Sequence, residues 1–168
     1  MRLTKQYASG FLATLPEELM VPMYYELKKM SSIFEKSTDY INIVEFDLEE
    51  FDQFRKILKD EFHPLLINFL EVLAQDGLLN RLDTIIEDYE LSLIEANVLF
   101  DVRVTSAREL SADFKEKIEK LVQERWGNNY LLAFKVDKAL IGGVRLEVNE
   151  AVVDTTFRSR IDQILRGV

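Results

Sequence analysis

The spacing of apolar residues changes once along this chain of 168 residues, near Asn97. Before that point apolar side chains recur at intervals of three and four, the spacing of amphipathic helices. Directly after it, the alternation expected of a strand with one buried face runs through Val98, Phe100, Val102 and Val104. A helical first part followed by a part that contains strands predicts two structural units, residues 1–97 and 98–168.

Five amphipathic segments precede Asn97. Thr14 and Glu17 have the spacing of a capping box, while Pro64 and Gly77 are placed to begin and to end a helix. Short-looped amphipathic helices can bury their apolar stripes only against one another, so residues 1–97 are expected to form an all-α bundle. The five helices are expected to begin near Leu3, Glu17, Asp47, Pro64 and Leu82.

The second unit is expected to be smaller and mixed. Ser111 can cap a helix that ends at Gly127, and alternating residues predict strands over 130–136 and 141–148. A turn at Asp137 and Lys138 predicts that these two strands form a hairpin. A short third strand and a closing helix are expected to follow. The fold class predicted for the whole chain is therefore α+β, a helical bundle with a smaller C-terminal mixed α/β domain.

Charge and composition exclude several classes of protein. The net charge is −9, and residues 1–96 alone carry −10, which disfavours binding to nucleic acid. The chain has no cysteine, so a disulfide framework, a thiolate metal site and a cysteine nucleophile are excluded. No stretch approaches the ~18 apolar residues of a membrane span or resembles a signal sequence. We expect a protein that does not insert into the membrane.

No catalytic, cofactor-binding or metal-binding constellation stands out. The adjacent Gly142 and Gly143 lack the lysine and hydroxyl residues of a phosphate-binding loop and are typical of a sheet bulge. His63, the single histidine, precedes Pro64 and is interpreted as a helix-entry residue. Two acidic clusters are interpreted as solvated helix faces: Glu49, Glu50 and Asp52, and Glu87, Asp88 and Glu90.

One basic run stands near the end of the chain. Arg158, Arg160 and Arg166 lie on the predicted closing helix, where arginine stabilises a helix C-terminus or binds an acidic partner. Both readings remain open. The residues alone therefore favour a binding or scaffolding protein over an enzyme.

The segment from Val136 to Ile164 resembles the C-terminal signature of the delta subunit of F-type ATP synthase, the bacterial counterpart of the mitochondrial oligomycin-sensitivity-conferring protein. Further similarity lies in Tyr7 and Ala8, in residues 66–85 and in residues 104–118. Residues 9–11, Ser-Gly-Phe, depart from the Ala-Leu-Phe common in the family. The signature is carried by Asp137, Leu140, Ile141, Gly142, Gly143, Val153, Asp154, Arg158, Arg160 and Ile161.

The resemblance implies a six-helix bundle, with a short extra helix around 37–46, and a non-catalytic subunit without cofactors. Such a subunit joins the catalytic head to the peripheral stalk, so that proton-driven rotation is coupled to ATP synthesis. The implied partners are N-terminal segments of the alpha subunits for residues 1–97 and the b subunits for residues 98–168. The implied location is the cytoplasmic face of the cell membrane, as a monomer within a hetero-oligomer.

The resemblance also implies a groove for an alpha-subunit segment between the first and fifth helices. Counting the helix at 82–93 as the fifth, we expect Leu3, Tyr7, Phe11, Ile85, Asp88 and Tyr89 to line this groove. Each apolar member alone is typical of interior packing, whereas the group is expected to leave one edge exposed. The stalk-facing or signature residues are expected to be Asp137, Gly142, Gly143, Asp154, Arg158 and Arg160.

Two alternatives belong to other classes. A small carboxylate-dependent hydrolase would need a buried acid with a raised pKa inside a pocket. A helical adaptor of some unrelated complex would share the bundle, but the C-terminal signature disfavours it.

Overall fold

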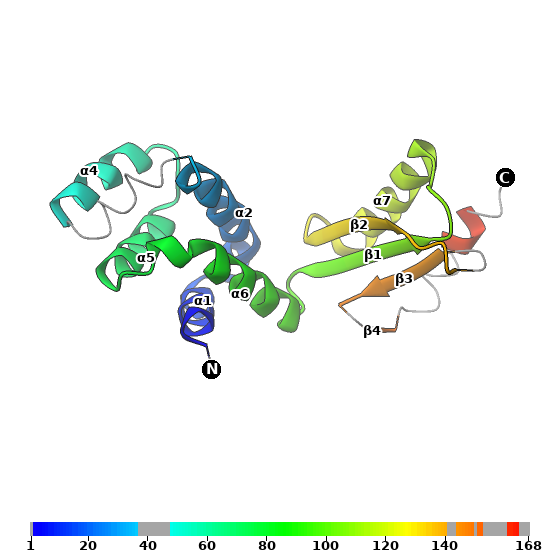
Figure 1. Ribbon diagram of the computed structural model, residues 1–168, viewed down its shortest axis with the longest axis horizontal. Coiled ribbons are helices and arrows are strands. Elements are labelled where there is room, and N and C mark those ends of the chain that lie inside the picture. The colour runs from blue at the N-terminus through cyan, green and yellow to red at the C-terminus, as the bar shows by residue number, and fades with distance from the viewer. Residues whose placement is uncertain (1, 37–47, 141–143, 150, 153–160, 165–168) are drawn as a thin grey trace. The chain divides into compact units, whose positions relative to one another are not determined.

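The computed structural model describes residues 2–36, 48–140, 144–149, 151–152 and 161–164. The chain forms two compact units, Met1–Leu93 and Ile94–Val168, shown with their element labels in Figure 1. The first unit is helical and the second combines helix with a small sheet. Each unit has its own core and is described separately.

The described part of the first unit contains five α-helices and a single 3-10 turn, η1 (Leu79–Arg81). The predicted all-helical character is confirmed for these residues. The short extra helix expected around 37–46 lies outside the described residues. The α-helices are α1 (Leu3–Thr14), α2 (Glu17–Phe34), α4 (Leu48–Leu58), α5 (Pro64–Gln75) and α6 (Leu82–Glu95).

Local capping explains both ends of α5, but α1 and α2 begin without a side-chain cap. Before α5 the His63 side chain accepts a hydrogen bond from the Leu65 amide, so its predicted helix-entry role is confirmed. Gly77 follows α5 with a φ of 65°, a conformation that favours glycine. The capping box predicted at Thr14 is wrong, because its hydroxyl donates to the Phe11 carbonyl 2.7 Å away. Helix α2 begins after Pro16 without a side-chain cap.

The helical unit closes around α6. Tyr89 is fully buried, and its hydroxyl donates to the Met20 carbonyl over 2.7 Å, which satisfies the polar end of this large side chain. Phe11 of α1 stacks on Phe69 of α5, with ring centroids 4.1 Å apart and ring planes 2° from parallel. Other fully buried core residues are Leu27, Met30, Leu66, Leu70, Ile85 and Leu93.

The second unit contains a four-stranded sheet in the order β2-β1-β3-β4. Its strands are β1 (Phe100–Ser106), β2 (Tyr130–Val136), β3 (Val144–Val148) and β4 (Ala151–Val152). β1 pairs in parallel with β2 and antiparallel with β3. The mixed character predicted for this unit is confirmed, and the antiparallel pair β3 and β4 encloses the turn at Asn149.

The predicted hairpin between 130–136 and 141–148 is wrong, because β1 lies between these strands. Val102 and Val104 of β1 are fully buried, so this strand suits the centre of the sheet. β2 has only intermediate and exposed residues, as an edge strand does. A parallel neighbour requires a crossover, and α7 (Ala112–Trp126) supplies it.

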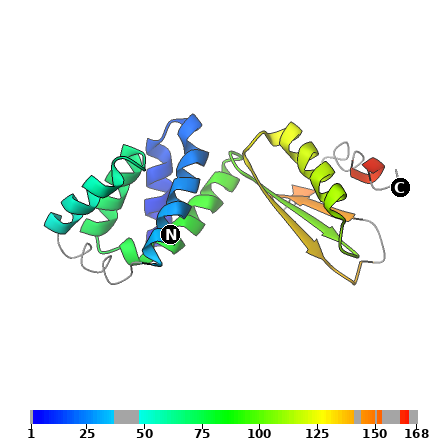
Figure 2. The ribbon, with the colours of Figure 1, turned by 90° about the horizontal axis from the view of Figure 1, so that it is seen from above.

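Helix α7 covers one face of the sheet (Figure 2). It packs its buried residues Ile118, Leu121 and Val122 against the strands, and Ile161 from the helical residues 161–164 joins the same core. The Ser111 side chain accepts a hydrogen bond from the Phe114 amide at 3.4 Å, and Gly127 ends the helix with positive φ. Both predicted helix ends are therefore confirmed.

Candidate binding groove

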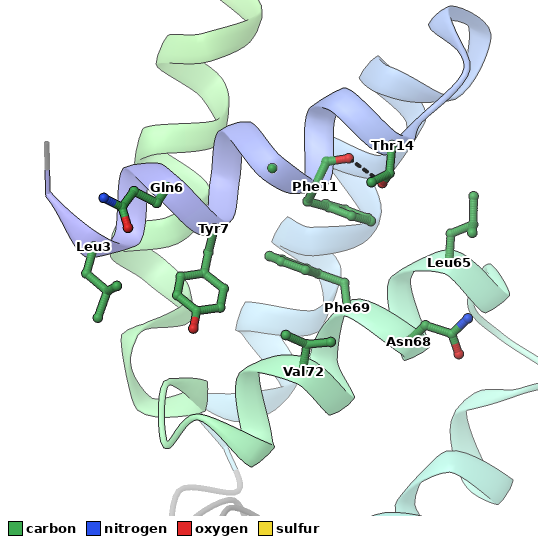
Figure 3. Close-up of a pocket in the computed structure, with 10 residues that line it drawn as sticks. Leu3, Gln6, Tyr7, Phe11, Thr14, Leu65, Asn68, Phe69 and Val72 are labelled. Atoms are coloured by element: carbon green, nitrogen blue, oxygen red, sulfur yellow. Dashed lines mark hydrogen bonds between the residues drawn. The ribbon is translucent and has the colours of Figure 1, made fainter.

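An open groove of about 500 Å³ runs between α1 and α5 (Figure 3). The side chains of Tyr7 and Phe11 point from α1 toward α5, and those of Phe69 and Val72 point back. The ten residues that line it are Leu3, Gln6, Tyr7, Gly10, Phe11, Thr14, Leu65, Asn68, Phe69 and Val72.

Helical periodicity builds both walls. On α1 the lining positions recur every three or four residues from Leu3 to Thr14, and on α5 they do so from Leu65 to Val72. Phe11 and Phe69 are nearly buried, whereas the side chains at the rim are open: Leu3 is 48% exposed and Val72 is 44% exposed. An apolar floor with exposed apolar rims is typical of a surface that another chain covers.

The polar groups around the groove are held by neighbours. The Tyr7 hydroxyl donates to Asp76 Oδ2 over 2.6 Å, and this hydrogen bond, with desolvation, raises the pKa of Tyr7. Asn68 Oδ1 accepts from Arg55 Nη1 at 3.3 Å, and Arg55 also pairs with Glu71. None of the ten lining residues carries a formal charge at neutral pH. The groove is suited to an apolar helix face rather than to an ionic ligand.

A buried carboxylate on α6 holds the N-terminal end of α1 through Arg2. Asp88 of α6 is 2% exposed and accepts a hydrogen bond from Arg2 Nη2 at 2.7 Å. Desolvation by itself would raise the pKa of Asp88, but the hydrogen bond from Arg2 and the positive charges of Arg2 and Lys5 favour the carboxylate, and the pKa lies below its ordinary value. The solvated position predicted for Asp88 is therefore wrong.

The six residues predicted to line an alpha-subunit groove do not lie together on one surface. Leu3, Tyr7 and Phe11 line the groove between α1 and α5. Ile85 and Tyr89 have no exposed surface and Asp88 almost none, because α6 is the central helix of this unit. The lining residues that the sequence analysis missed are Gln6, Gly10 and Thr14 of α1 and Leu65, Asn68, Phe69 and Val72 of α5. For α5 the signal was its wide apolar face, which has Leu65 and Val72 outside the Leu66, Leu70 and Leu73 stripe.

Most of the residues predicted to face the stalk lie outside the part of the chain that the structure describes. Gly142, Gly143, Asp154, Arg158 and Arg160 lie outside the described residues, as does Arg166 of the basic run. Asp137 is described: its carboxylate accepts a hydrogen bond from the Ala139 amide at 2.9 Å, and its amide donates to the Ser106 carbonyl. Asp137 thus shapes the turn after β2.

A second hollow, of about 350 Å³, lies between α2 and α6 and has a different lining. Ser31 donates to Asp83 across it, and Tyr24 donates to Glu90 beside it. Burial, followed by the hydrogen bond to Glu90, raises the pKa of Tyr24. The residues around this hollow are Lys28, Ser31, Ser32, Glu35, Asp83, Ile86, Glu87 and Glu90.

Within the described ranges, no group of three or more histidine or acidic side chains is placed to hold a metal ion. In the same part of the chain, no helix has the length and apolarity that crossing a membrane requires. The main feature of the described helical residues is therefore the exposed apolar groove between α1 and α5.

Comparison with known proteins decides the family. The family model described as ATP synthase delta (OSCP) subunit matches residues 3–167. The chain belongs to the ATP synthase delta (OSCP) family. It is therefore a non-catalytic stator subunit of the peripheral stalk, and the hydrolase alternative is wrong.

Individual relatives align with most or all of the chain. ATP synthase subunit delta of Streptococcus equinus is 26% identical over 165 residues, which cover 96% of this chain and 93% of that protein. The Fervidobacterium nodosum subunit delta is 28% identical over 146 residues, covering 84% and 81%. A chain in the Toxoplasma gondii mitochondrial ATP synthase hexamer shares the fold, with a TM-score of 0.55, 18% identity, and coverage of 99% and 97%.

Proposed function

We propose that the groove between α1 and α5 binds an amphipathic helix at the N-terminus of an ATP synthase alpha subunit. The observation that carries this proposal is an exposed apolar groove of about 500 Å³ on a stator subunit of the delta family. A helix that binds in such a groove contacts it through apolar side chains at helical spacing. The delta-family chain would in this way be attached to the catalytic head.

The groove's chemistry suits a stator joint. A stator carries a repeated sideways load, so its contacts need slow dissociation more than fast recognition. The rims at Leu3 and Val72 and the floor at Phe69 present apolar surface that a bound helix would remove from water. A few such apolar anchors in a desolvated centre carry most of the binding energy of an interface.

Charge favours a partner of the opposite sign. Residues 1–96 carry 19 acidic and 9 basic side chains, while the groove's lining is uncharged. A helix with an apolar face and basic flanks matches both properties, because its flanks meet the acidic surface while its apolar face fills the groove.

The second unit is proposed to bind the b subunits of the peripheral stalk, which places the complex at the cytoplasmic face of the membrane. Support comes from the delta-family signature, whose Asp137 organises the turn after β2. The functional division into residues 1–97 and 98–168 forms part of the same proposal. Pull-down of b subunits from solubilised membranes, with the full chain as bait, tests it, and failure to recover them contradicts it.

The groove is tested by titrating the full chain with a synthetic peptide copied from the N-terminus of the alpha subunit of the same organism. Val72→Asp places a charge on the exposed rim of α5, and we expect at least a 30-fold loss of affinity, about 2 kcal/mol. Leu91→Asp is the matched control, because Leu91 is 50% exposed on α6 and does not line the groove.

Three results would contradict the groove: no binding by the wild-type chain, full binding by Val72→Asp, or equal losses in Val72→Asp and Leu91→Asp. Tyr7→Asp gives a second test on the α1 wall and is expected to weaken the complex too. Tyr89→Asp is unsuitable, because Tyr89 is buried in the core and its substitution would unfold the bundle.

A further inference from the structure

Gly10 occupies an interior position of α1 without any conformational requirement for glycine. Of the three glycines that the structure describes, Gly77 and Gly127 have positive φ, but Gly10 has ordinary helical geometry. Glycine in the middle of a helix is less stable than alanine, because it loses more backbone freedom on folding.

Packing within the chain gives no reason for the glycine either. A Cβ added at position 10 would meet no heavy atom within 4 Å, so the folded chain has room for a side chain there. The reason for the open space is its place: Gly10 lines the groove, one turn from Tyr7 and one turn from Thr14 on the same face of α1. The absence of a side chain at this position leaves the groove wider on its α1 side, where Phe11 and Phe69 also line it.

We propose that Gly10 is a specificity-determining position that accepts a large aliphatic or aromatic side chain of the bound helix. This inference rests on the proposed function of the groove and adds which feature of the partner the groove selects. The bound helix places its largest apolar side chain over Gly10, where its contacts reach the α1 backbone. A side chain at position 10 would compete for that same space.

The test separates stability from affinity. Gly10→Ala and Gly10→Leu should raise the melting temperature of the full chain by about 1 to 4 °C, since both residues favour helix over glycine. The same substitutions should weaken binding of the alpha-subunit peptide, about threefold for alanine and more than 50-fold for leucine, by filling the space. A purely structural glycine would instead give lower stability together with lower affinity, so the sign of the stability change separates the two interpretations.

Ala13→Leu is the matched control. Ala13 is exposed on the same helix, does not line the groove, and gains a side chain of similar size, so affinity should stay within twofold of wild type. A compensating peptide sharpens the test. We expect that one peptide, in which a single apolar residue is replaced by alanine, binds the Gly10→Leu variant at least tenfold more tightly than the unmodified peptide binds that variant. The same alanine-substituted peptide should bind the wild-type chain more weakly than the unmodified peptide does.

The outcomes distinguish this inference from the proposed function. If the wild-type chain binds the peptide and Gly10→Leu binds it as well as Ala13→Leu does, the role of Gly10 is overturned and the groove stands. If Gly10→Leu binds weakly but no alanine-substituted peptide restores binding, the selected side chain is likewise overturned. If the wild-type chain fails to bind, the groove and the inference both fall.

Discussion

Two hollows lined by described residues of the helical unit have opposite chemistry. The α1/α5 groove, about 500 Å³, is lined by ten residues without a charge, whereas five of the eight residues around the 350 Å³ hollow between α2 and α6 are charged. In the α2/α6 hollow, side chains of this chain satisfy one another, as Ser31 does with Asp83. In the α1/α5 groove, the exposed apolar side chains are not covered by other side chains of the described residues.

The difference shows that shape alone does not make a docking surface. Polar side chains on both walls of the α2/α6 hollow form hydrogen bonds or meet water, so leaving it open costs little. Apolar rims such as Leu3 and Val72 gain free energy only when another surface covers them. We therefore expect substitutions at the two hollows to act on different measurable quantities.

Loss of the groove floor should have the largest effect. Phe69→Ala removes the ring stacked on Phe11 and should lower the free energy of unfolding by about 3 kcal/mol, because it leaves a cavity in a nearly buried site. Urea denaturation of the full chain measures this loss. Ile57→Ala, at a side chain that is 67% exposed, serves as control and should change stability by less than about 0.5 kcal/mol. Equal effects would mean that the stacked pair adds nothing.

The next largest effect concerns the carboxylate that holds α1. Above pH 5, Asp88→Asn should lower the free energy of unfolding by about 2 kcal/mol, because the ion pair between the Asp88 carboxylate and Arg2 is replaced by a hydrogen bond from Arg2 to a neutral amide. The folded pKa of Asp88 lies below its unfolded value of about 3.9, so its contribution is present above that value and is lost as the pH falls through the folded pKa.

Urea denaturation between pH 7 and pH 2 measures this pH dependence. The difference between wild type and Asp88→Asn should be constant near neutral pH and should shrink below about pH 4. A difference that grows on acidification would contradict the low pKa of Asp88 and the role of its pair with Arg2.

A smaller effect is expected in the α2/α6 hollow. Tyr24→Phe removes the hydroxyl that donates to Glu90 and should cost about 1 kcal/mol of stability, the usual net value of one hydrogen bond. Affinity for the alpha-subunit peptide should stay unchanged, as calorimetric titration would show. A loss of affinity at constant stability would mean that the two hollows act together.

The smallest effect should be kinetic. Glu87 is an exposed acid at the α2/α6 hollow, and Glu87→Gln should slow association of the peptide less than threefold and leave its dissociation rate unchanged. Stopped-flow measurements at low and high salt test this, and the difference should vanish at high salt because screening shortens the range of the charge. A changed dissociation rate would place Glu87 in the contact itself.

Most features that local patterns determine could be predicted from the sequence, the Thr14 capping box being an exception. Helical spacing, the Ser111 cap and the glycine ends at Gly77 and Gly127 depend on neighbouring residues, and the structure confirms them. The partner of strand 130–136 depends on a strand about 30 residues earlier, and proximity along the chain wrongly favoured a hairpin.

The prediction of the groove shows the same difference between local patterns and contacts of distant segments. The α1 residues Leu3, Tyr7 and Phe11 could be predicted, because one helix has one apolar face. Which helix lies opposite is a property of packing, and the apolar stripe of α6 could not be told from that of α5 by spacing alone. The burial of Asp88 was missed for a similar reason, since its partner Arg2 is 86 residues away in the sequence.

The central position of β1 has a consequence for synthesis on the ribosome. Both of its neighbours, β2 and β3, come later in the chain, so β1 emerges with two open edges while every helix of the first unit has already been translated. From the time β1 has left the ribosome until β2 and β3 follow it, the nascent chain exposes this unpaired segment with Val102 and Val104. The alternating Asp101 and Arg103, which form an ion pair in the finished protein, place charges on that segment during the interval and disfavour its self-association.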